Sequence, residues 1–164
     1  SNILSKVKGS KLILKSSTKK EIENFKDFFY KNKVLNSVQF LPTAKFFEEH
    51  IKLYNRIDIS LDTYPYNGVT TSFESIWMGV PVITMNGFNF NSRCGVSINK
   101  NIGMLDFIAN NHYEYVSIAK KMSEDHELHL KNGIKLREKA INSALFDTKL
   151  FAKEFEKVLW KVLN

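Results

Sequence analysis

Apolar residues along the chain follow two alternating patterns. Short apolar runs bounded by polar or turn-forming residues predict strands, whereas apolar residues that recur every three or four positions predict helices. We expect strands at residues 11–15, 38–41, 59–61 and 80–84, and helices at 3–7, 20–32, 47–54, 71–78, 104–109, 112–122, 127–141 and 150–163, with a further helix that starts within 92–97. Strands that alternate with helices are typical of an α/β fold with a parallel sheet and helices on both faces, here ending in several helices.

Two of the predicted helices carry pronounced apolar stripes. In the helix at 20–32, the residues Ile22, Phe25, Phe28 and Phe29 recur at helical spacing, so we expect them to face the core. The helix at 150–163 carries a second stripe, which we expect to pack in the core or against another domain rather than on a membrane. The members of this second stripe are Phe151, Phe155, Val158, Leu159 and Val162.

The stretch DISLDTYPYNGVTTSFESIWMGVPVIT, residues 58–84, is the most informative part of the chain. A short strand stops at turn-forming residues that include Gly68, and a helix follows. Either Thr70 or Thr71 is a suitable N-cap, and Thr71 with Glu74 fits a capping box, in which the two side chains satisfy two backbone donors reciprocally. A glycine and a proline then end the helix before the next strand.

This order of elements places the free N–H groups of a helix N-terminus at the carboxyl edge of a sheet. Such a loop can hold a phosphate through its backbone N–H groups and the positive end of the helix dipole. It can equally be an ordinary connection, since it is neither a Walker loop nor a GxGxxG motif. Glu74 likewise has two interpretations, as a cap of its own helix or as a ligand contact.

Length and composition narrow the class of protein. The 164 residues are 43% hydrophobic and 13% aromatic, enough for the core of a single domain over residues 1–164. No run of about 18 uncharged apolar residues predicts a membrane span. The single cysteine, Cys94, agrees with a reducing cytoplasm. The chain opens with Ser1 rather than Met, so we interpret it as a fragment of a longer protein.

The net charge of +7 would suit a polyanion. The lysines, however, are dispersed along predicted helices among apolar residues, and the sequence contains no nucleic-acid-binding motif. We therefore expect neither a nucleic-acid partner nor a membrane partner.

Four segments together resemble a known family. They are LDTYPYNGVTTSFESIWMGVPVITM, SRCGVS, IANNHYEYVSIAKKM and SALFDTKLFAKEFE. In this order, and over nearly the whole chain, they are similar to the C-terminal catalytic half of the O-linked N-acetylglucosamine transferase and Spindly family. The resemblance implies one Rossmann-like half of a glycosyltransferase B fold, which holds a nucleotide sugar in a cleft that faces an N-terminal half.

The resemblance also implies how the nucleotide sugar binds. It assigns the pyrophosphate to the loop and helix start at Asn67, Gly68, Thr70 and Thr71. Well-known members carry His immediately before the two threonines, where this chain has Val69. The side-chain contact from that position is therefore lost, while the backbone contacts are retained.

A second group of residues is assigned to the nucleoside by the same resemblance. The sequence EEH places His50 at the family's distance before LDT, so His50 is expected to stack on the uracil and Glu74 to reach the ribose. In the family, the loop before this helix supplies uracil contacts and a lysine, which here implies Ala44 and Lys45, with one extra residue in the loop. Without the resemblance, a lone histidine on a helix is more often a surface or core residue.

The remaining candidates favour structural roles. Arg93 can meet a phosphate or pin its loop to a carboxylate or to backbone carbonyls, and we favour the structural role. The pair His126 and His129 lacks the HExxH spacing, and no DxD motif is present. We therefore expect no metal and no cofactor besides the substrate.

These patterns and the resemblance together predict the donor-binding half of an inverting glycosyltransferase. It would transfer a GlcNAc-like sugar or fucose from a nucleotide diphosphate, expected to be UDP, to Ser or Thr hydroxyls of a protein. Because the facing N-terminal half is absent, the fragment alone is expected to be inactive, and no catalytic residue is assigned. Two alternatives remain: a non-catalytic nucleotide-sugar sensor or interaction domain with the same fold, and half of a sugar-nucleotide epimerase.

Overall fold

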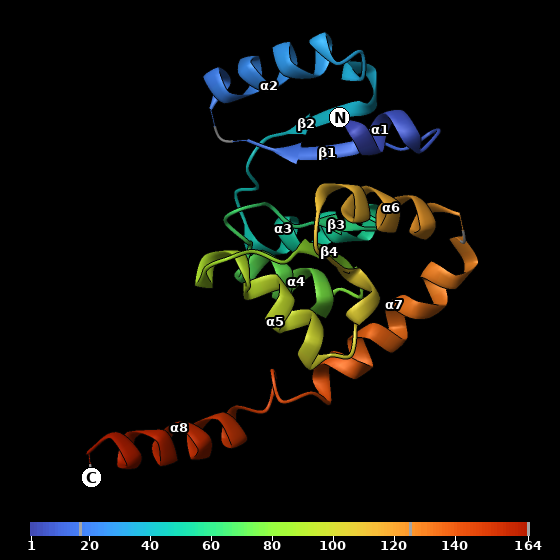
Figure 1. Cartoon of the computed structure of the whole chain (residues 1–164). Helices are drawn as coiled ribbons and strands as arrows, with labels where there is room; N and C mark the ends of the chain where they lie inside the picture. Colours follow the sequence, from blue (N-terminus) through green and yellow to red (C-terminus); the bar gives the residue numbers. More distant parts are fainter. Residues whose placement is uncertain (17, 125, 164) are drawn as a thin grey trace.

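The computed structural model describes residues 1–16, 18–124 and 126–163. For residues 126–132 it describes the backbone but not the side chains. Over these ranges the backbone forms five strands in two parallel sheets, which helices flank (Figure 1). None of the described helices combines the length and the apolar character that a membrane crossing requires. The α/β class predicted from alternating strands and helices is confirmed.

The first sheet contains the two N-terminal strands. Strand β1 (Leu12–Lys15) pairs in parallel with β2 (Val38–Leu41), so that the residues at corresponding positions lie side by side. Helix α2 (Lys19–Lys31) connects them. It begins where the Thr18 hydroxyl accepts a hydrogen bond from the Glu21 N–H at 3.2 Å, as an N-cap should.

The aromatic residues of α2 are less buried than their spacing predicts. Phe29 is buried, but Phe25 is 42% exposed and Phe28 is 50% exposed. The prediction that all of them face the core was therefore wrong for these two residues. A sheet of two strands offers α2 a narrow surface, which covers one ring and leaves the flanking rings outside it.

The second sheet has the order β3–β4–β5, with all pairs parallel. Its strands are β3 (Ser60–Leu61), β4 (Val82–Met85) and β5 (Ile108–Ala109). Every residue of β4 is buried, as expected for a central parallel strand covered on both faces. Helix α4 (Thr70–Trp77) connects β3 to β4 and ends before Gly79, which has a φ of +79°.

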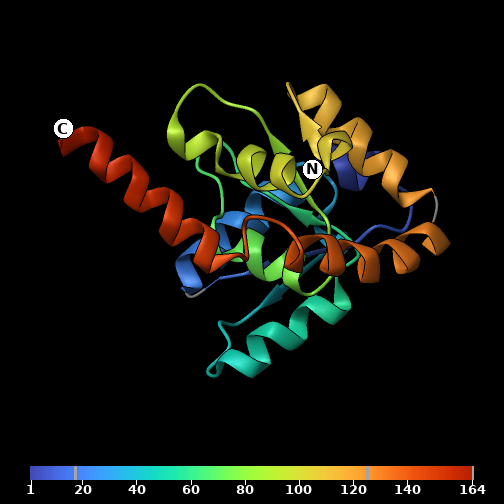
Figure 2. The same cartoon turned by 90° about the horizontal axis from the view of Figure 1, so that it is seen from below.

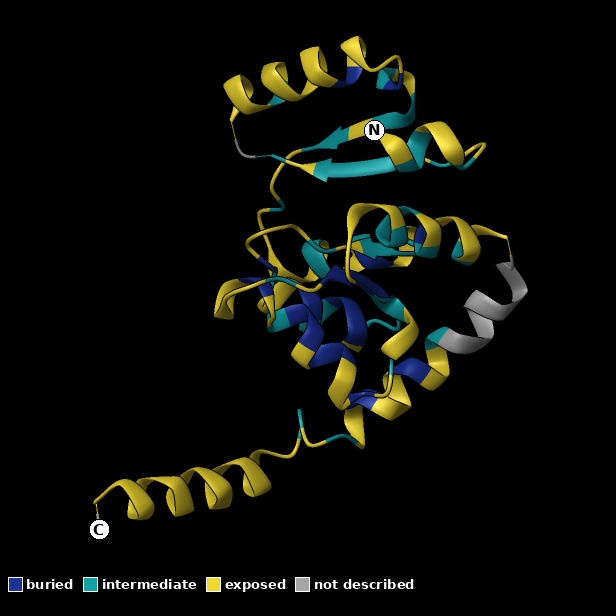
Figure 3. Cartoon of the chain, viewed as in Figure 1, coloured by how far each residue is buried: buried dark blue, intermediate teal, exposed yellow. Residues whose placement is uncertain are grey.

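Helices enclose this second sheet. Both α5 (Cys94–Asn101) and α6 (His112–Ser123) contact β4, while α7 (His126–Ile141) packs against α4. Buried residues gather where β4, α4 and α5 meet (Figure 3). The central cluster consists of Ile76, Val82, Ile98, Ile102, Leu136 and Ala140.

The helix predicted at residues 104–109 is wrong for the last part of the segment, which is a strand. Residues 104–109 form a short 3₁₀ helix, η4 (Leu105–Phe107), followed by β5 (Ile108–Ala109). Periodicity alone does not distinguish a strand from a helix in a segment of six mostly apolar residues. The rest of the described chain forms α1 (Asn2–Lys6), η1 (Leu35–Ser37), α3 (Phe47–Lys52), η2 (Leu53–Arg56), η3 (Phe90–Ser92) and α8 (Thr148–Leu163).

Helix α8 extends away from the rest of the chain (Figures 1 and 2). Its described residues are exposed, and its apolar stripe, including Phe151 at 67% exposure and Val162 at 79%, contacts no core (Figure 3). The prediction that this stripe packs in the core of the chain was wrong. Packing against another domain stays a prediction.

A cavity of about 700 Å³ lies where the two sheets face each other. Residues of β1 and β3 line it, together with parts of α1 and α6. Within the described part of the chain, β1 pairs with β2 alone and β3 with β4 alone. Each sheet therefore presents one unpaired strand edge beside the cavity.

Candidate functional site

Asp62 organises the loop that follows β3. Its Oδ1 accepts a hydrogen bond from the Gly68 N–H at 2.8 Å, and its Oδ2 accepts one from the Thr84 hydroxyl at 2.7 Å. Burial raises the pKa of the Asp62 carboxyl, and the hydrogen bonds from Thr84 and Gly68 oppose this shift. The carboxylate thus ties the start of the loop to its end and to β4.

Asn67 locks the same loop from within. The side chain is 2% exposed; its Nδ2 donates to the Thr63 carbonyl at 2.8 Å, and its Oδ1 accepts from the Gly95 N–H at 3.1 Å. The Asn67 N–H donates to the Asn91 carbonyl at 2.9 Å. Both ends of the Asn67 amide are therefore engaged inside the protein, which gives this predicted site residue a supporting position.

The segment SRCGVS packs closely against this loop. A Cβ atom at Gly95 would collide with the Asp62 carboxylate and with the Thr84 side chain, so only glycine fits here. Arg93 donates through Nε to the Gly87 carbonyl at 2.8 Å. The predicted structural role of Arg93, pinning its loop to a backbone carbonyl, is confirmed.

The N-terminus of α4 is not capped as the sequence predicted. Val69 occupies the N-cap position, and no side chain caps the helix. The predicted capping box of Thr71 and Glu74 is wrong, because the Glu74 carboxylate accepts hydrogen bonds from another element. Among the described residues, no acceptor is recorded for the N–H groups of Thr70 and Thr71. These donors and the positive end of an eight-residue helix face the loop.

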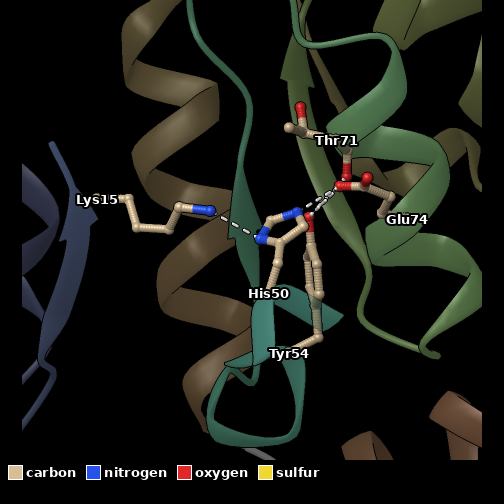
Figure 4. Close-up of polar contacts among 5 residues, drawn as sticks. All are labelled: Lys15, His50, Tyr54, Thr71 and Glu74. Atoms are coloured by element: carbon tan, nitrogen blue, oxygen red, sulfur yellow. Dashed lines mark hydrogen bonds and ion pairs between the residues drawn. The ribbon is translucent and has the colours of Figure 1, made fainter. Parts of the chain in front are cut away.

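The Glu74 carboxylate is held by α3 and the turn after it (Figure 4). His50 Nε2 lies 2.8 Å from Glu74 Oε2, and the Tyr54 hydroxyl donates to the same oxygen at 3.2 Å and to the Thr71 carbonyl at 3.2 Å. The side chains of His50 and Glu74 are 21% and 17% exposed. Burial, and then the charge of Glu74, raise the pKa of Tyr54, which keeps its hydroxyl protonated as a donor.

Lys15 reaches this group from the other sheet. It stands at the carboxyl end of β1, and its Nζ lies 2.7 Å from His50 Nδ1 (Figure 4). The histidine ring is thus held at both nitrogens, by β1 on one side and by α4 on the other. Elements 35 and 24 residues away from His50 in sequence meet on one imidazole.

The structure brings some of the predicted site residues together more closely than others. His50 and Glu74 are in contact, and Tyr54 links them to the first turn of α4, which holds Thr70 and Thr71. Two further predicted residues, Ala44 and Lys45, lie on the loop between β2 and α3. The Lys45 N–H donates to the Glu49 carboxylate at 3.3 Å, and its side chain is exposed.

Three residues of this group were not predicted from the sequence: Lys15, Tyr54 and Asp62. Tyr54 follows His50 by four positions, which places both on one face of a helical segment. Lys15 and Asp62 stand at the ends of β1 and β3, the edge where α/β sheets bind ligands. These positions could have predicted that the residues lie near one edge of a sheet. They could not have predicted which side chains the residues contact.

The chemistry of the site is that of donors for an anion and acceptors for hydroxyls. The described residues contain no group of three or more His, Cys, Asp or Glu side chains placed to hold a metal ion. The side chains of His126 and His129 lie outside the described residues. The backbone N–H groups of Thr70 and Thr71 can bind an anion, and the carboxylate of Glu74 can accept from a ligand hydroxyl.

Comparison with known proteins gives consistent matches. The model of glycosyl transferase family 41 matches residues 1–155. Over 127 residues the chain is 36% identical to the probable UDP-N-acetylglucosamine–peptide N-acetylglucosaminyltransferase SPINDLY of Solanum lycopersicum. The matched stretch covers 76% of this chain and 14% of that protein. The chain is 35% identical over 118 residues to the UDP-N-acetylglucosamine–peptide N-acetylglucosaminyltransferase of Caenorhabditis elegans, covering 70% of this chain and 10% of that protein.

A solved structure agrees with these matches. An O-GlcNAc transferase mutant of Thermobaculum terrenum superposes with a TM-score of 0.83 at 26% identity, covering 91% of this chain and 29% of that one. The likeness confirms the predicted Rossmann-like half of a glycosyltransferase B fold. The chain spans only a small part of the length of all these relatives.

Proposed function

Because the chain belongs to glycosyl transferase family 41, we propose that it forms the donor-binding half of an inverting glycosyltransferase. The longer protein would transfer a GlcNAc-like sugar or fucose from a nucleotide diphosphate, UDP in the first instance, to Ser or Thr hydroxyls of an acceptor protein. The proposal depends on one observation: backbone donors for an anion lie beside side chains that can contact a nucleoside. Free N–H groups at the start of α4 adjoin the paired His50 and Glu74 side chains.

Each group suits one part of a nucleotide diphosphate. The N–H groups of Thr70 and Thr71 would hold the diphosphate at the positive end of α4. Glu74 Oε1, which has no recorded partner among the described residues, would accept a hydrogen bond from a ribose hydroxyl. His50, fixed at both nitrogens, would present its flat ring to the base.

Displacement at the anomeric carbon places negative charge on the departing diphosphate. Donors that are already oriented stabilise this charge more in the transition state than in the ground state, which accelerates the reaction. Removal of one donor from a comparable oxyanion site costs about 2.7 to 4 kcal/mol. The fixed loop supports this role, since Asp62 and Asn67 hold it before any ligand binds. No metal is required by this scheme, because the helix terminus supplies the positive charge.

The rest of the longer protein would complete both the sheet and the cleft. The unpaired edges of β1 and β3 line a cavity of about 700 Å³, which supports insertion of a further parallel strand from outside these 164 residues. Amide exchange at Ile13 and Leu61 would then be slower in the longer protein than in this chain. Equal exchange rates would contradict the insertion. Without the facing half, the chain alone is expected to bind donor weakly and to be inactive.

NMR titration of the labelled chain tests the donor site. Saturable shifts with UDP, exceeding those with GDP and ADP, are expected at the amides of Thr70 and Thr71 and at the His50 ring. Pyrophosphate alone should move only the two amides, and uridine alone only the ring. His50→Gln and Glu74→Ala should weaken UDP binding, whereas Glu48→Ala, at an exposed position of the same helix, should not.

Each other outcome of the titration has a defined meaning. A preference for GDP would point to a fucosyl donor. No saturable shift at millimolar nucleotide would refute the donor site.

A second candidate, a non-catalytic nucleotide-sugar sensor, is favoured by one observation: Val69 is 46% exposed at the N-cap and offers no polar side chain. Sugar transfer or donor hydrolysis by the longer protein would exclude the sensor.

A further inference from the structure

The hydrogen bonds around His50 define its protonation state. A lysine ammonium has three donors and no acceptor, so Lys15 Nζ at 2.7 Å must donate to His50 Nδ1. Nδ1 therefore carries no proton. The single imidazole proton then lies on Nε2, which donates it to the Glu74 carboxylate at 2.8 Å. The ring is neutral and bridges a cation and an anion.

We propose that Lys15 is a positioning residue that holds His50 as the neutral Nε2–H tautomer and fixes the ring for the nucleotide. This inference rests on the proposed donor site for its functional consequence, but not for its geometry. The three side chains come from β1, α3 and α4, and the two hydrogen bonds fix the ring at opposite nitrogens (Figure 4). Rotation of the ring by 180° about χ2 would place Cδ2–H against the ammonium and Cε1–H against the Glu74 carboxylate, so both hydrogen bonds would be lost.

The groups that face the ring leave Lys15 as the residue that decides the tautomer. Among the described residues, the titratable groups in contact with His50 are Lys15, Glu74 and Tyr54 of η2, whose ring centroid lies 5.6 Å from that of the histidine. The Tyr54 hydroxyl is already directed to the Glu74 carboxylate and the Thr71 carbonyl. Glu74 can accept a hydrogen bond from Nε2 of a neutral ring and also from an imidazolium, so it does not by itself select the neutral form. Of the contacts that the described residues make with the ring, the donor from Lys15 is the one that excludes a proton on Nδ1.

Loss of Lys15 would therefore change the state of His50. With Nδ1 open to water, the ring can take a second proton, pair with Glu74 as an imidazolium, or exchange tautomers. Fixing the tautomer is worth one charge-assisted hydrogen bond at a partly exposed site, so we expect UDP to bind about fivefold more weakly to Lys15→Met. A general loss of positive charge would also weaken binding of an anion. Lys11→Met is the matched control, since Lys11 is exposed just before the same strand.

The test is a ¹⁵N spectrum of the histidine rings in the intact chain at pH 7, with the signals of His50 identified by His50→Gln. The wild-type chain should show an unprotonated Nδ1 and a protonated Nε2. Lys15→Met should shift both signals towards averaged or protonated values, and Lys15→Arg, which keeps a donor, should restore the wild-type pattern. Lys11→Met should leave the spectrum and the UDP affinity unchanged.

Several outcomes would overturn the inference. One is a protonated Nδ1 in the wild-type chain, and another is an unchanged His50 spectrum in Lys15→Met. Equal losses of UDP affinity in Lys15→Met and Lys11→Met would show that Lys15 acts only through its charge. If instead the wild-type tautomer is as described and UDP does not bind, the proposed function fails while the assignment of the tautomer stands.

Discussion

Glu74 is the residue on which the cohesion of the site depends, and its replacement gives the sharpest test of the structure. Its Oε2 accepts from His50 at 2.8 Å and from Tyr54 at 3.2 Å, with the carboxylate only 17% exposed. Glu74→Ala removes the acceptor of both donors. Each hydrogen bond to a charged group is worth about 1.5 to 3 kcal/mol. The bond from Tyr54 to Glu74 is expected to contribute less, because the Tyr54 hydroxyl shares its one proton between Glu74 and the Thr71 carbonyl.

These contacts give an expected order of stabilities. Glu74→Ala should lower the free energy of unfolding by about 2 to 3 kcal/mol, because water reaches His50 partly and Tyr54 hardly at all. Glu74→Gln keeps an acceptor and loses the charge, so about 1 kcal/mol is expected. Tyr54→Phe should cost about 1 kcal/mol. Glu48→Ala, an exposed position on α3, should remain within about 0.5 kcal/mol of wild type.

The assay is urea unfolding at pH 7, with the double variant of Tyr54→Phe and Glu74→Ala completing a cycle. A coupling energy of at least about 0.5 kcal/mol is expected between residues in direct contact. Additive effects, with coupling below about 0.3 kcal/mol, would refute the claim that Glu74 holds Tyr54. Equal losses for the alanine and glutamine variants would show that the negative charge of Glu74 stabilises the site, and that a neutral acceptor of the same shape does not replace it.

Three further predictions follow from the loop and the buried phenols. Asn67→Ala leaves a buried donor and acceptor unpaired and should cost about 2 to 3 kcal/mol in urea unfolding, with the exposed Asn91→Ala nearly neutral. Gly95→Ala overpacks the loop and should cost about 2 to 3 kcal/mol in the same assay, with Ser97→Ala on the same helix nearly neutral. Burial raises the pKa of Tyr115 above its usual 10.0, so the unfolded chain loses the Tyr115 proton at a lower pH than the folded chain does. The contribution of Tyr115 to the free energy of unfolding is therefore fully present below about pH 10 and decreases above it. A melting temperature that stays constant above about pH 10 would contradict this prediction.

The order of elements around the predicted loop was accessible from sequence because each has a strong local signal. β3, α4 and β4 lie where the turn formers and Gly79 place them. The strand β5 was missed because two residues of strand pairing against β4 cannot be distinguished from a helical run without knowledge of the neighbour. The local sequence pattern thus predicts a helix or strand well where the element is long or is bounded by turn-forming residues.

The partners within the site were not accessible in this way. Thr71 and Glu74 have the spacing of a capping box, and the structure instead directs Glu74 to His50, 24 residues earlier in the chain. The capping hydrogen bond is worth about 1 kcal/mol, less than two bonds to a partly buried carboxylate, so the tertiary contacts prevail over the local one. The contact of Lys15 with His50 likewise depends on how two sheets are placed, which no periodicity records.

The hydrogen bonds of the loop also restrict where an anion can bind. The Gly68 N–H is directed to Asp62, and the Asn67 amide is directed to Thr63 and Gly95, so neither is available without breaking a buried interaction. Among the described residues, the N–H groups of Thr70 and Thr71 have no hydrogen-bond acceptor, and they lie at the positive end of the helix dipole. A loop already held by its own carboxylate and amide does not have to order when a diphosphate arrives, so its donors are oriented in advance. The hydrogen bonds of Asn67 and Gly68 thus support the loop itself, and binding of the pyrophosphate by Thr70 and Thr71 stays a prediction.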